Sequence, residues 1–469
     1  MERLAVQKGQ VASVMGSLAL CMLLPSLGTS IANVALPTLA TTFSASFQEV
    51  QWVVIAYLLA TTILVVSVGR LGDVFGRRQL LLLGILLFTA GSAAAGAAPA
   101  LEALIAARAL QGLGAAAMLA LTLAFVSSTM PAAQVGRAMG MLGALSAIGT
   151  ALGPSLGGLL IAGLGWQWIF LINVPLGLFT LTLAWRYLPA DPVRADGATP
   201  FDVKGSVLLA LALAAYALSM TLGDGEFGYR NAALIGLAAT ALALFLVVEK
   251  RAVAPLVGLA TLRGPGLASS LLVSALVATV MMTTLIVGPF YLSIGVGLGT
   301  AHVGLAMSAG PAVAALTGVP AGRIVDRFGA HRMTVAALAG MALGGVALAM
   351  MPAARGIVGY LLPLMLLTSS YALLQTANNT AVMRDVPADR RGVIGGLLNL
   401  SRNLGLITGA SVLGAIFSAS SRSAGTSSSA AAVTFGMHVT FAVATGLVVL
   451  ALLIAIRSQG RPVPVSASA

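Results

Sequence analysis

Fourteen stretches of apolar residues, each long enough to form a membrane helix, follow one another along the chain. A helix needs roughly 20 apolar residues to cross the hydrocarbon core of a bilayer. The stretches have the approximate limits 11–36, 50–69, 79–98, 102–127, 138–163, 168–188, 206–222, 232–249, 267–293, 302–322, 333–352, 356–382, 392–418 and 435–456. They predict an all-α membrane protein with fourteen transmembrane helices.

The scarcity of charge excludes several classes of protein. Of the residues, 59% are hydrophobic and 8% are charged, whereas soluble domains carry roughly 25% charged residues. Such a chain has too little polar surface for a soluble enzyme or a disordered protein. The formal net charge of +12 comes from cations scattered between apolar runs. A nucleic-acid-binding surface needs clustered cations, so we expect the lipid bilayer, and no nucleic acid, as a partner.

The cations are divided unequally between the two sides of the predicted topology. Twenty of the 25 Lys and Arg residues fall on the side that carries both termini, three fall on the other side, and Arg108 and Arg402 lie within spans. Cytoplasmic loops carry an excess of Lys and Arg. We therefore predict a multi-pass protein of the cytoplasmic membrane with both termini in the cytoplasm. The preference for Arg over Lys suggests a bacterial source.

A charged motif occurs twice along the chain. Residues 69–76 read Gly-Arg-Leu-Gly-Asp-Val-Phe-Gly, and residues 322–329 read Gly-Arg-Ile-Val-Asp-Arg-Phe-Gly. The repeat predicts two homologous halves with two helices inserted between them, which is typical of secondary transporters. The predicted domains are an N-terminal six-helix bundle at 1–190, a linker with two inserted helices at 191–265, a C-terminal six-helix bundle at 266–457 and a cytoplasmic tail at 458–469.

Four patterns together resemble one known family. They are the charged motif at 69–78, the fourth-helix pattern at 104–114, the Gly-x3-Gly-Pro-x2-Gly-Gly pattern at 149–158 and the segment at 166–177. The sequence resembles the major facilitator superfamily and, within it, the fourteen-helix drug:proton antiporters of the EmrB/QacA type. The resemblance covers nearly the whole chain. It implies the major facilitator fold and export of small molecules or drugs, with protons as the coupling ion.

The resemblance implies a conformational latch in the two charged motifs. The implied latch residues are Gly69, Asp73, Gly76, Arg77, Arg78 and Asp326. In the family, this loop between helices two and three stabilises one transport conformation relative to the other. A solvated charged turn is the alternative interpretation.

The fifth span carries the glycine pattern that is typical of antiporters. Its motif residues are Gly149, Gly153, Pro154, Gly157 and Gly158. Gly149, Gly153 and Gly157 are four residues apart and share one helix face, where small residues let helix backbones approach closely. The resemblance implies that this element governs the direction of opening; close packing alone is the alternative.

Two arginines lie within the predicted spans. An Arg deep in a span costs roughly 2.5–3.5 kcal/mol on insertion scales, so it should face a cavity or a partner. Arg108 lies about six residues into the fourth span, where it is able to snorkel, and the resemblance implies a role in proton coupling. Arg402 lies near the middle of the thirteenth span. Gln111 is one turn from Arg108 and either holds its guanidinium or touches substrate.

Several polar side chains are candidates for the substrate cavity. Gln375, Asn378 and Asn379 share one face of the twelfth span because their spacing is i, i+3, i+4, and Asn33 lies within the first span. Interhelical hydrogen bonding is the alternative for each. Trp52 and Tyr57, near the start of the second span, fit an interfacial aromatic belt, with lining of the cavity as the alternative.

The first span departs from the pattern of the exporter family. Members usually carry an acidic residue where this sequence has Gly28. All 13 acids fall near the ends of the predicted spans or in loops, although proton relays usually use embedded Asp, Glu or His. Glu49 and Glu102, on the outer side, are the remaining candidates for proton coupling.

Three functions stay open on the sequence. The first is a proton-coupled drug exporter. The second is an exporter of a neutral or anionic metabolite with different or no proton coupling, because the charge within the spans is positive. The third is a non-transporting membrane sensor, disfavoured because the chain has no sizeable extramembrane domain. We find no nucleotide-binding, metal or nucleophile motif, and we predict no enzyme activity, no cofactor and no metal.

Overall fold

The structure is a computed structural model that describes residues 2–129, 132–189, 203–221, 228–251, 265–352, 355–383, 391–424 and 429–458. Every regular element in these ranges is a helix. The helices are α1 (Glu2–Thr42), α2 (Phe47–Phe75), α3 (Arg77–Gly96), α4 (Leu101–Thr129), α5 (Ala132–Leu164), α6 (Trp168–Leu171), α7 (Asn173–Tyr187), α8 (Val203–Thr221), α9 (Tyr229–Arg251), α10 (Pro265–Phe290), η2 (Tyr291–Gly295), α11 (Thr300–Phe328), α12 (Ala330–Ala349), α13 (Gly356–Met383), α14 (Arg391–Thr408), η4 (Gly409–Leu413), α15 (Gly414–Ser423) and α16 (Ser429–Arg457).

A helix, or a run of consecutive helices, covers each of the fourteen predicted spans. The sixth span is α6 followed by α7, the ninth is α10 followed by η2, and the thirteenth is α14, η4 and α15. In the described part of the chain, twelve helices are long and apolar enough to cross a membrane, and α11 makes a thirteenth if its two bent parts count as one. In the fifth span, the apolar stretch of α5 among the described side chains is Ile148–Leu164. The all-α fold predicted from hydropathy is therefore confirmed.

Helix α11 bends by 50° between its parts Thr300–Gly318 and Pro320–Phe328. Proline lacks the backbone N–H that would continue the hydrogen-bond ladder and clashes with the preceding turn. Proline is one of the few recognised causes of a sharp helix kink. Pro320 therefore accounts for the bend.

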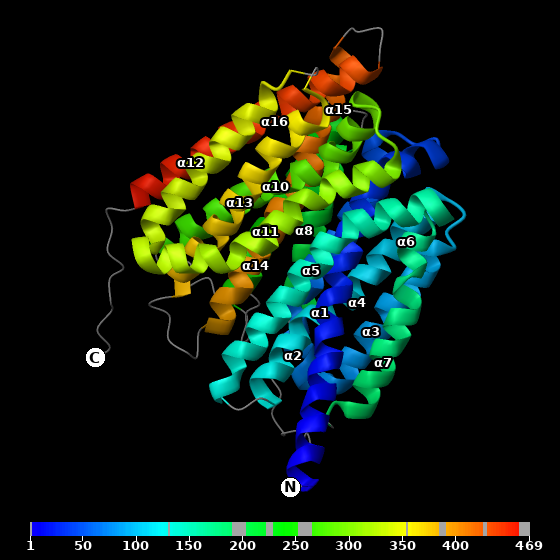
Figure 1. Ribbon diagram of the computed structural model, residues 1–469, viewed down its shortest axis with the longest axis vertical. Coiled ribbons are helices and arrows are strands. Elements are labelled where there is room, and N and C mark those ends of the chain that lie inside the picture. Colours follow the sequence, from blue (N-terminus) through cyan, green and yellow to red (C-terminus); the bar gives the residue numbers. More distant parts are fainter. Residues whose placement is uncertain are drawn as a thin grey trace.

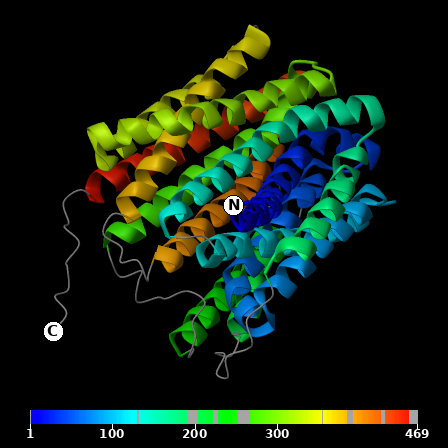
Figure 2. The ribbon, with the colours of Figure 1, turned by 60° about the horizontal axis from the view of Figure 1, so that its bottom comes forward.

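The helices form two groups of the same design with an insertion between them. Helices α1–α7 pack with one another, and we call them the first half; helices α10–α16 pack with one another, and we call them the second half. Figures 1 and 2 show the blue-to-teal helices of the first half beside the green-to-red helices of the second half. Helices α8 and α9 pack against each other as a hairpin, and α8 also packs on α2.

Helices α2 and α11 end in the same way, at the two copies of the charged motif. Gly76 ends α2 at φ 95° and donates its N–H to Gly72 O at 2.9 Å. Gly329 ends α11 at φ 87° and donates to Val325 O at 2.9 Å. A residue with a side chain rarely adopts such a φ. The motif therefore fixes two sharp helix-to-helix turns, and residues 69–75, expected in a loop, belong to α2 instead.

Candidate functional site

The two halves meet where α5 packs against α11. A Cβ on Gly158 would lie 2.9 Å from the Cα of Gly304 and 2.7 Å from the carbonyl oxygen of Thr300. A Cβ on Gly304 would lie 2.8 Å from the Cα of Gly158. All three distances are shorter than those that real Cβ atoms show. The helices therefore cross backbone to backbone, which is possible because both positions are glycine.

The other glycines of the α5 motif face α1. A Cβ on Gly149 would lie 2.6 Å from Leu23 O, one on Gly153 would lie 2.8 Å from Ile31 N, and one on Gly157 would lie 2.8 Å from Val34 Cγ1. The close approach predicted from the spacing of these glycines is confirmed. The motif thus joins α5 to α1 on one side and, through Gly158, to the second half on another. Its role in the direction of opening stays a prediction.

Side chains from α2 join the halves at the same end of the molecule. The ring of Phe47 lies 4.7 Å from that of Phe290 and 4.9 Å from that of Phe417, centroid to centroid. Gln48 Nε2 donates to Ser418 Oγ at 2.5 Å, and both side chains are buried. Aromatic pairs in such tilted arrangements attract one another beyond their burial alone. We call the end of the molecule that carries Phe47, Gly158, Gly304 and Ser418 the closed end.

Helix α8 is attached to both halves. Trp52 Nε1, on α2, donates to Thr221 Oγ1 at 3.0 Å, and Tyr216 OH donates to Thr408 Oγ1, on α14, at 3.2 Å. Each threonine hydroxyl gives its own proton to a carbonyl of its own helix, Ala217 O and Leu404 O respectively, so its oxygen is free to accept. The inserted hairpin therefore bridges the seam between α2 and α14.

Arg108 is fully buried within the first half, so the snorkelling interpretation is wrong. Its Nε donates to Val53 O at 2.9 Å and its Nη1 donates to Gln111 Oε1 at 2.5 Å. Gln111 Nε2 in turn donates to Ser92 Oγ at 2.7 Å. The expectation that Gln111 holds the guanidinium is confirmed. A charge in a low-dielectric interior needs such partners, and the remaining nitrogen, Nη2, has no hydrogen-bond partner.

Aromatic rings also stabilise the Arg108 charge. Its guanidinium carbon lies 4.3 Å from the centroid of the Tyr57 ring and 5.7 Å from that of Phe170. Tyr57 is 1% exposed and its hydroxyl donates to Pro25 O at 2.9 Å. The ring face carries the negative part of its quadrupole and attracts a cation. The prediction that Tyr57 belongs to an interfacial belt is therefore wrong.

Gly28 lies beside this Arg108 network. A Cβ on Gly28 would lie 3.3 Å from Phe88 Cζ and 3.5 Å from Gln111 Nε2. An acidic residue at this position, which the resemblance leads one to expect, would lie beside Phe88 and Gln111. The sequence has none there, and the described hydrogen bonds of Arg108 go to a carbonyl and an amide.

The two candidate coupling acids lie at the beginnings of helices. Glu49 Oε2 accepts from Ser46 N at 2.7 Å and from Ser46 Oγ at 2.8 Å, which forms a capping box at the start of α2. Such a box satisfies backbone donors that the first turn leaves without partners. Glu102 is an exposed residue in the first turn of α4. Their role in proton coupling stays a prediction.

The latch residues lie at the opposite end of α2 from the closed end. Arg78 Nη2 donates to Trp185 O, which ties the start of α3 to the last turn of α7. Arg77 begins α3, and Asp326 is exposed in the last turn of α11. The surroundings of Gly69 and the side chain of Asp73 lie outside the described residues. The latch function therefore stays a prediction, with Gly76 and Gly329 as its paired turns.

The predicted cavity residues differ in their surroundings. Asn33 is 1% exposed and donates to Thr29 O of its own helix at 3.2 Å. Asn378 Nδ2 donates to Ser270 O on α10 at 3.3 Å, which is the interhelical alternative, and Gln375 Nε2 donates to Tyr371 OH at 2.6 Å. Asn379 is exposed. Contact of these residues with a substrate stays a prediction.

Arg402 is exposed although it lies in the middle of the thirteenth span. Its Nη2 donates to Asn399 Oδ1 at 3.2 Å, while its neighbours Ser401 and Asn403 are buried. The sequence identified Arg402 but missed Asn399, which the i−3 spacing on the same helix face would have revealed. It also missed Tyr216, because a partner 192 residues away leaves no local signal.

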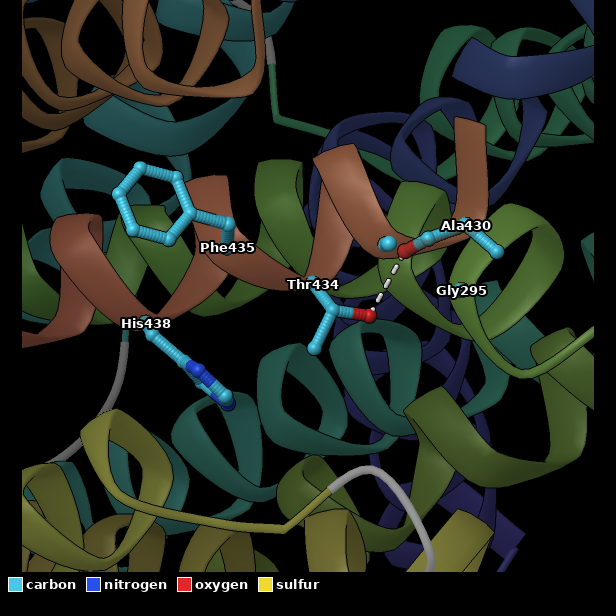
Figure 3. A pocket seen from close by; sticks show the side chains of 6 residues that line it. Gly295, Ala430, Thr434, Phe435 and His438 are labelled. Atoms are coloured by element: carbon cyan, nitrogen blue, oxygen red, sulfur yellow. Dashed lines mark hydrogen bonds between the residues drawn. The ribbon is translucent and has the colours of Figure 1, made fainter. Parts of the chain in front are cut away.

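Two pockets lie away from these residues. One, of about 410 Å³, is lined by Gly295, Ala430, Ala431, Thr434, Phe435 and His438. Figure 3 shows Thr434 and His438 on the same side of α16, with Thr434 bonded to Ala430 O. The other, of about 540 Å³, is a groove between α3 and α7. None of the predicted site residues lines either pocket.

Two similar helical halves that touch at one end, with polar groups buried inside membrane-length helices, define a membrane transporter. The Major Facilitator Superfamily pattern matches residues 18–410. The multidrug resistance protein Stp of Mycobacterium tuberculosis (strain CDC 1551 / Oshkosh) is 33% identical over 392 residues, which are 83% of this chain and 72% of that one. The riboflavin transporter RibZ of Clostridioides difficile (strain 630) is 30% identical, over 84% of this chain and 86% of that one.

The solved structures with the same fold are also transporters. A bacterial homologue of the human lysosomal transporter Spinster, in an inward-facing and occupied conformation, superposes with a TM-score of 0.72 at 14% identity over 96% of both chains. A D-xylose–proton symporter superposes with a TM-score of 0.69 at 16% identity, over 96% of this chain and 99% of that one. The chain belongs to the Major Facilitator Superfamily and is a multi-pass membrane transporter of small molecules.

Proposed function

We propose that this chain exports small organic molecules, drugs among them, from the cytoplasm by alternating access in exchange for protons. The observation that supports this proposal is the contact between the halves at the closed end. There the halves meet through glycine backbones at Gly158 and Gly304 and through the Phe47 ring. Repeats of this kind work by rocking against each other around a site near the bilayer midplane. The relatives named as multidrug resistance proteins support drugs as substrates.

The proposed orientation places the closed end outside and both termini in the cytoplasm. Twenty of the 25 cations fall on the side of the termini, and such an excess is typical of cytoplasmic loops. In this orientation the structure is the inward-facing state, in a cytoplasmic membrane. The two charged motifs that end at Gly76 and Gly329 then lie at the cytoplasmic ends of α2 and α11, where a latch is expected.

Glu49 and Glu102 are the acids proposed for proton coupling. Both lie in the first turn of their helices at the side of the closed end. Glu102 precedes Arg108 by six residues on α4, which is about 9 Å at the helical rise. A proton that arrives from outside would meet these carboxylates before it meets the Arg108 network.

A second candidate function is export of an anionic or neutral metabolite with different or no proton coupling. The described side chains include four acids, and each lies near a helix end: Glu49, Glu102, Glu249 and Asp326. Arg402, in contrast, is exposed in the middle of a span. This distribution of charge favours an anionic substrate over a cationic one.

Transport in proteoliposomes with an imposed pH gradient tests the proposal. Ethidium-like cations and organic anions are added separately, and both the compound and the pH gradient are followed. Movement of a compound together with dissipation of the gradient is expected for proton antiport. Movement of a compound without dissipation of the pH gradient supports the second candidate function. No movement of any compound excludes export. Glu49→Gln and Glu102→Gln are then compared, and unchanged pH dependence in both would exclude these two acids.

A further inference from the structure

One side of α14 is turned toward the space between the two halves. Three residues face α10: Ser401 Oγ donates to Leu271 O, and Cβ atoms on Gly405 and Gly409 would lie 2.8 Å from Ala278 Cβ and Met282 Cβ respectively. Thr408 faces α8 through Tyr216. Helix α14 also packs on α2. Neighbours therefore cover α14 on the α10 side and on the α8 side.

Asn399 and Arg402 point away from α8. Successive residues of an α-helix turn by about 100°, so Asn399, nine residues before Thr408, points to the opposite side of α14. Arg402 is turned from Thr408 by about 120°. Because α8 bridges the seam between α2 and α14, the opposite side of α14 faces the interior between the halves. Arg402 is exposed, which agrees with this direction.

Arg402 lies at the depth where a transported molecule would bind. It is the twelfth residue of α14, about 16 Å from the helix start at 1.5 Å per residue, in a hydrocarbon core about 30 Å thick. Charged side chains at this depth face water-filled pathways or partners. The exposure of Arg402 agrees with a water-filled cavity on this side of α14.

The Arg402–Asn399 pair offers hydrogen-bond donors to a ligand, and neither side chain carries a negative charge. A guanidinium can only donate, so the amide oxygen of Asn399 must accept from Arg402 Nη2, at 3.2 Å. This fixes the amide so that its NH2 group is a further donor. The described acids lie near the ends of other helices. Guanidinium groups bind carboxylates and related oxyanions through paired N–H bonds.

We infer that Arg402 and Asn399 form the recognition point for the anionic group of the substrate, and that the substrates are small organic anions with a carboxylate or sulfonate. This inference deepens the proposed function and rests on it. Asn399 orients the guanidinium and adds one donor. Arg402 supplies the charge that selects anions over cations.

Thermal stabilisation of the purified protein by a compound panel tests the inference. The panel holds aromatic and aliphatic scaffolds, each as the carboxylate, the amide and the amine. We expect at least one carboxylate to raise the melting temperature of the wild type more than its amide and amine do. Stabilisation by amines or amides alone, or by no carboxylate in the panel, would overturn the inference.

Three variants locate the effect at the pair. Arg402→Gln should weaken binding of the active carboxylate at least about tenfold, since hydrogen bonds to charged groups are the strong ones. Arg402→Lys should retain part of it, because the charge stays and the planar fork is lost. Asn399→Asp is nearly isosteric and supplies an internal carboxylate, so it should compete with the ligand and weaken binding as strongly as Arg402→Gln. Arg230→Gln, at an exposed site on α9, is the control and should bind as the wild type does.

The transport assay separates this inference from the proposed function. If no compound moves, export itself fails. A different outcome is that cations are transported, and that Arg402→Gln changes neither their transport nor the thermal stabilisation by carboxylates. In that case the assignment of Arg402 fails while export stands.

Discussion

A Cβ on Gly158 would lie 2.9 Å from the Cα of Gly304, so the fifth helix of the first half and the second helix of the other half cross without side chains between them. Such a contact holds while both positions lack a side chain. No side chains interlock at this crossing, so it should not oppose a movement in which the halves rock apart. This crossing makes the closed end a sensitive point for mutation.

Gly158→Leu should open the closed end. A leucine cannot fit against Gly304 and Thr300 O, so the variant should favour the state in which the halves separate here, and transport should fall at least about tenfold. The distance between spin labels at positions 163 and 299, where side chains meet open space, measures the opening. Gly318→Leu is the control on α11, because a Cβ there has no neighbour within 4 Å. An unchanged label distance in Gly158→Leu would contradict the prediction.

Removal of the Tyr57 ring should destabilise the first half more than removal of its hydroxyl. Tyr57→Phe loses the bond to Pro25 O, at about 1 kcal/mol, and keeps the ring under Arg108. Tyr57→Leu loses both, and a desolvated cation–π contact contributes about 2 kcal/mol. Reversible unfolding in mixed detergent micelles measures both. Equal stability of the two variants would show that the ring face does not stabilise Arg108.

Gly28→Asp should make transport depend more strongly on the pH gradient. The new carboxylate would start from a Cβ 3.5 Å from Gln111 Nε2, next to the buried guanidinium of Arg108. A titratable acid beside a cation gains a proton as the pH falls, and it then loses the attraction to the cation. Transport rates with and without a pH gradient are the measurement. Gly28→Asn is the matched control, and identical rates for Asp and Asn would contradict the prediction.

The bridge formed by α8 should favour the observed arrangement. Tyr216→Phe removes one hydrogen bond to the second half, and Trp52→Phe removes one to the first half. Hydrogen bonds between membrane helices contribute about 0.6 kcal/mol on average, so each variant should shift the ratio of closed to open populations about threefold. The same spin-label pair measures this ratio. Thr240→Val, on the exposed side of α9, is expected to leave it unchanged.

Gly76→Ala and Gly329→Ala should lower the melting temperature by similar amounts because the two turns are alike. Both residues have positive φ, 95° and 87°, with an extended ψ of 129° and 140°, and a residue with a side chain held in so sparsely populated a region costs about 1–3 kcal/mol. Gly322→Ala, which is helical with no neighbour within 4 Å of a Cβ, should instead be neutral or slightly stabilising. Melting temperatures compare the three. A neutral Gly76→Ala would argue against a demanding turn in the latch motif.

Much of the fold follows from local patterns in the sequence. The length and hydropathy of an apolar run are properties of neighbouring residues, so they locate the helices. The repeated motif predicts two halves because duplicated segments keep their turn geometry. Its two copies end at Gly76 and Gly329. The spacing of Gly149, Gly153 and Gly157 predicts a close helix approach for the same reason. The pairing of Gln111 with Arg108 also lies within one helix turn.

The tertiary structure decided which distant segments meet. The sequence does not indicate that Tyr57 lies under Arg108, that Gly158 meets Gly304 or that Tyr216 reaches Thr408, because each pair joins helices whose relative position depends on packing. Whether Arg402 faces lipid, protein or the interior is likewise set by α10, α8 and α2 around α14. Hydropathy encodes the depth of a residue in the membrane, whereas its direction and partners arise from the assembly of helices far apart in the chain.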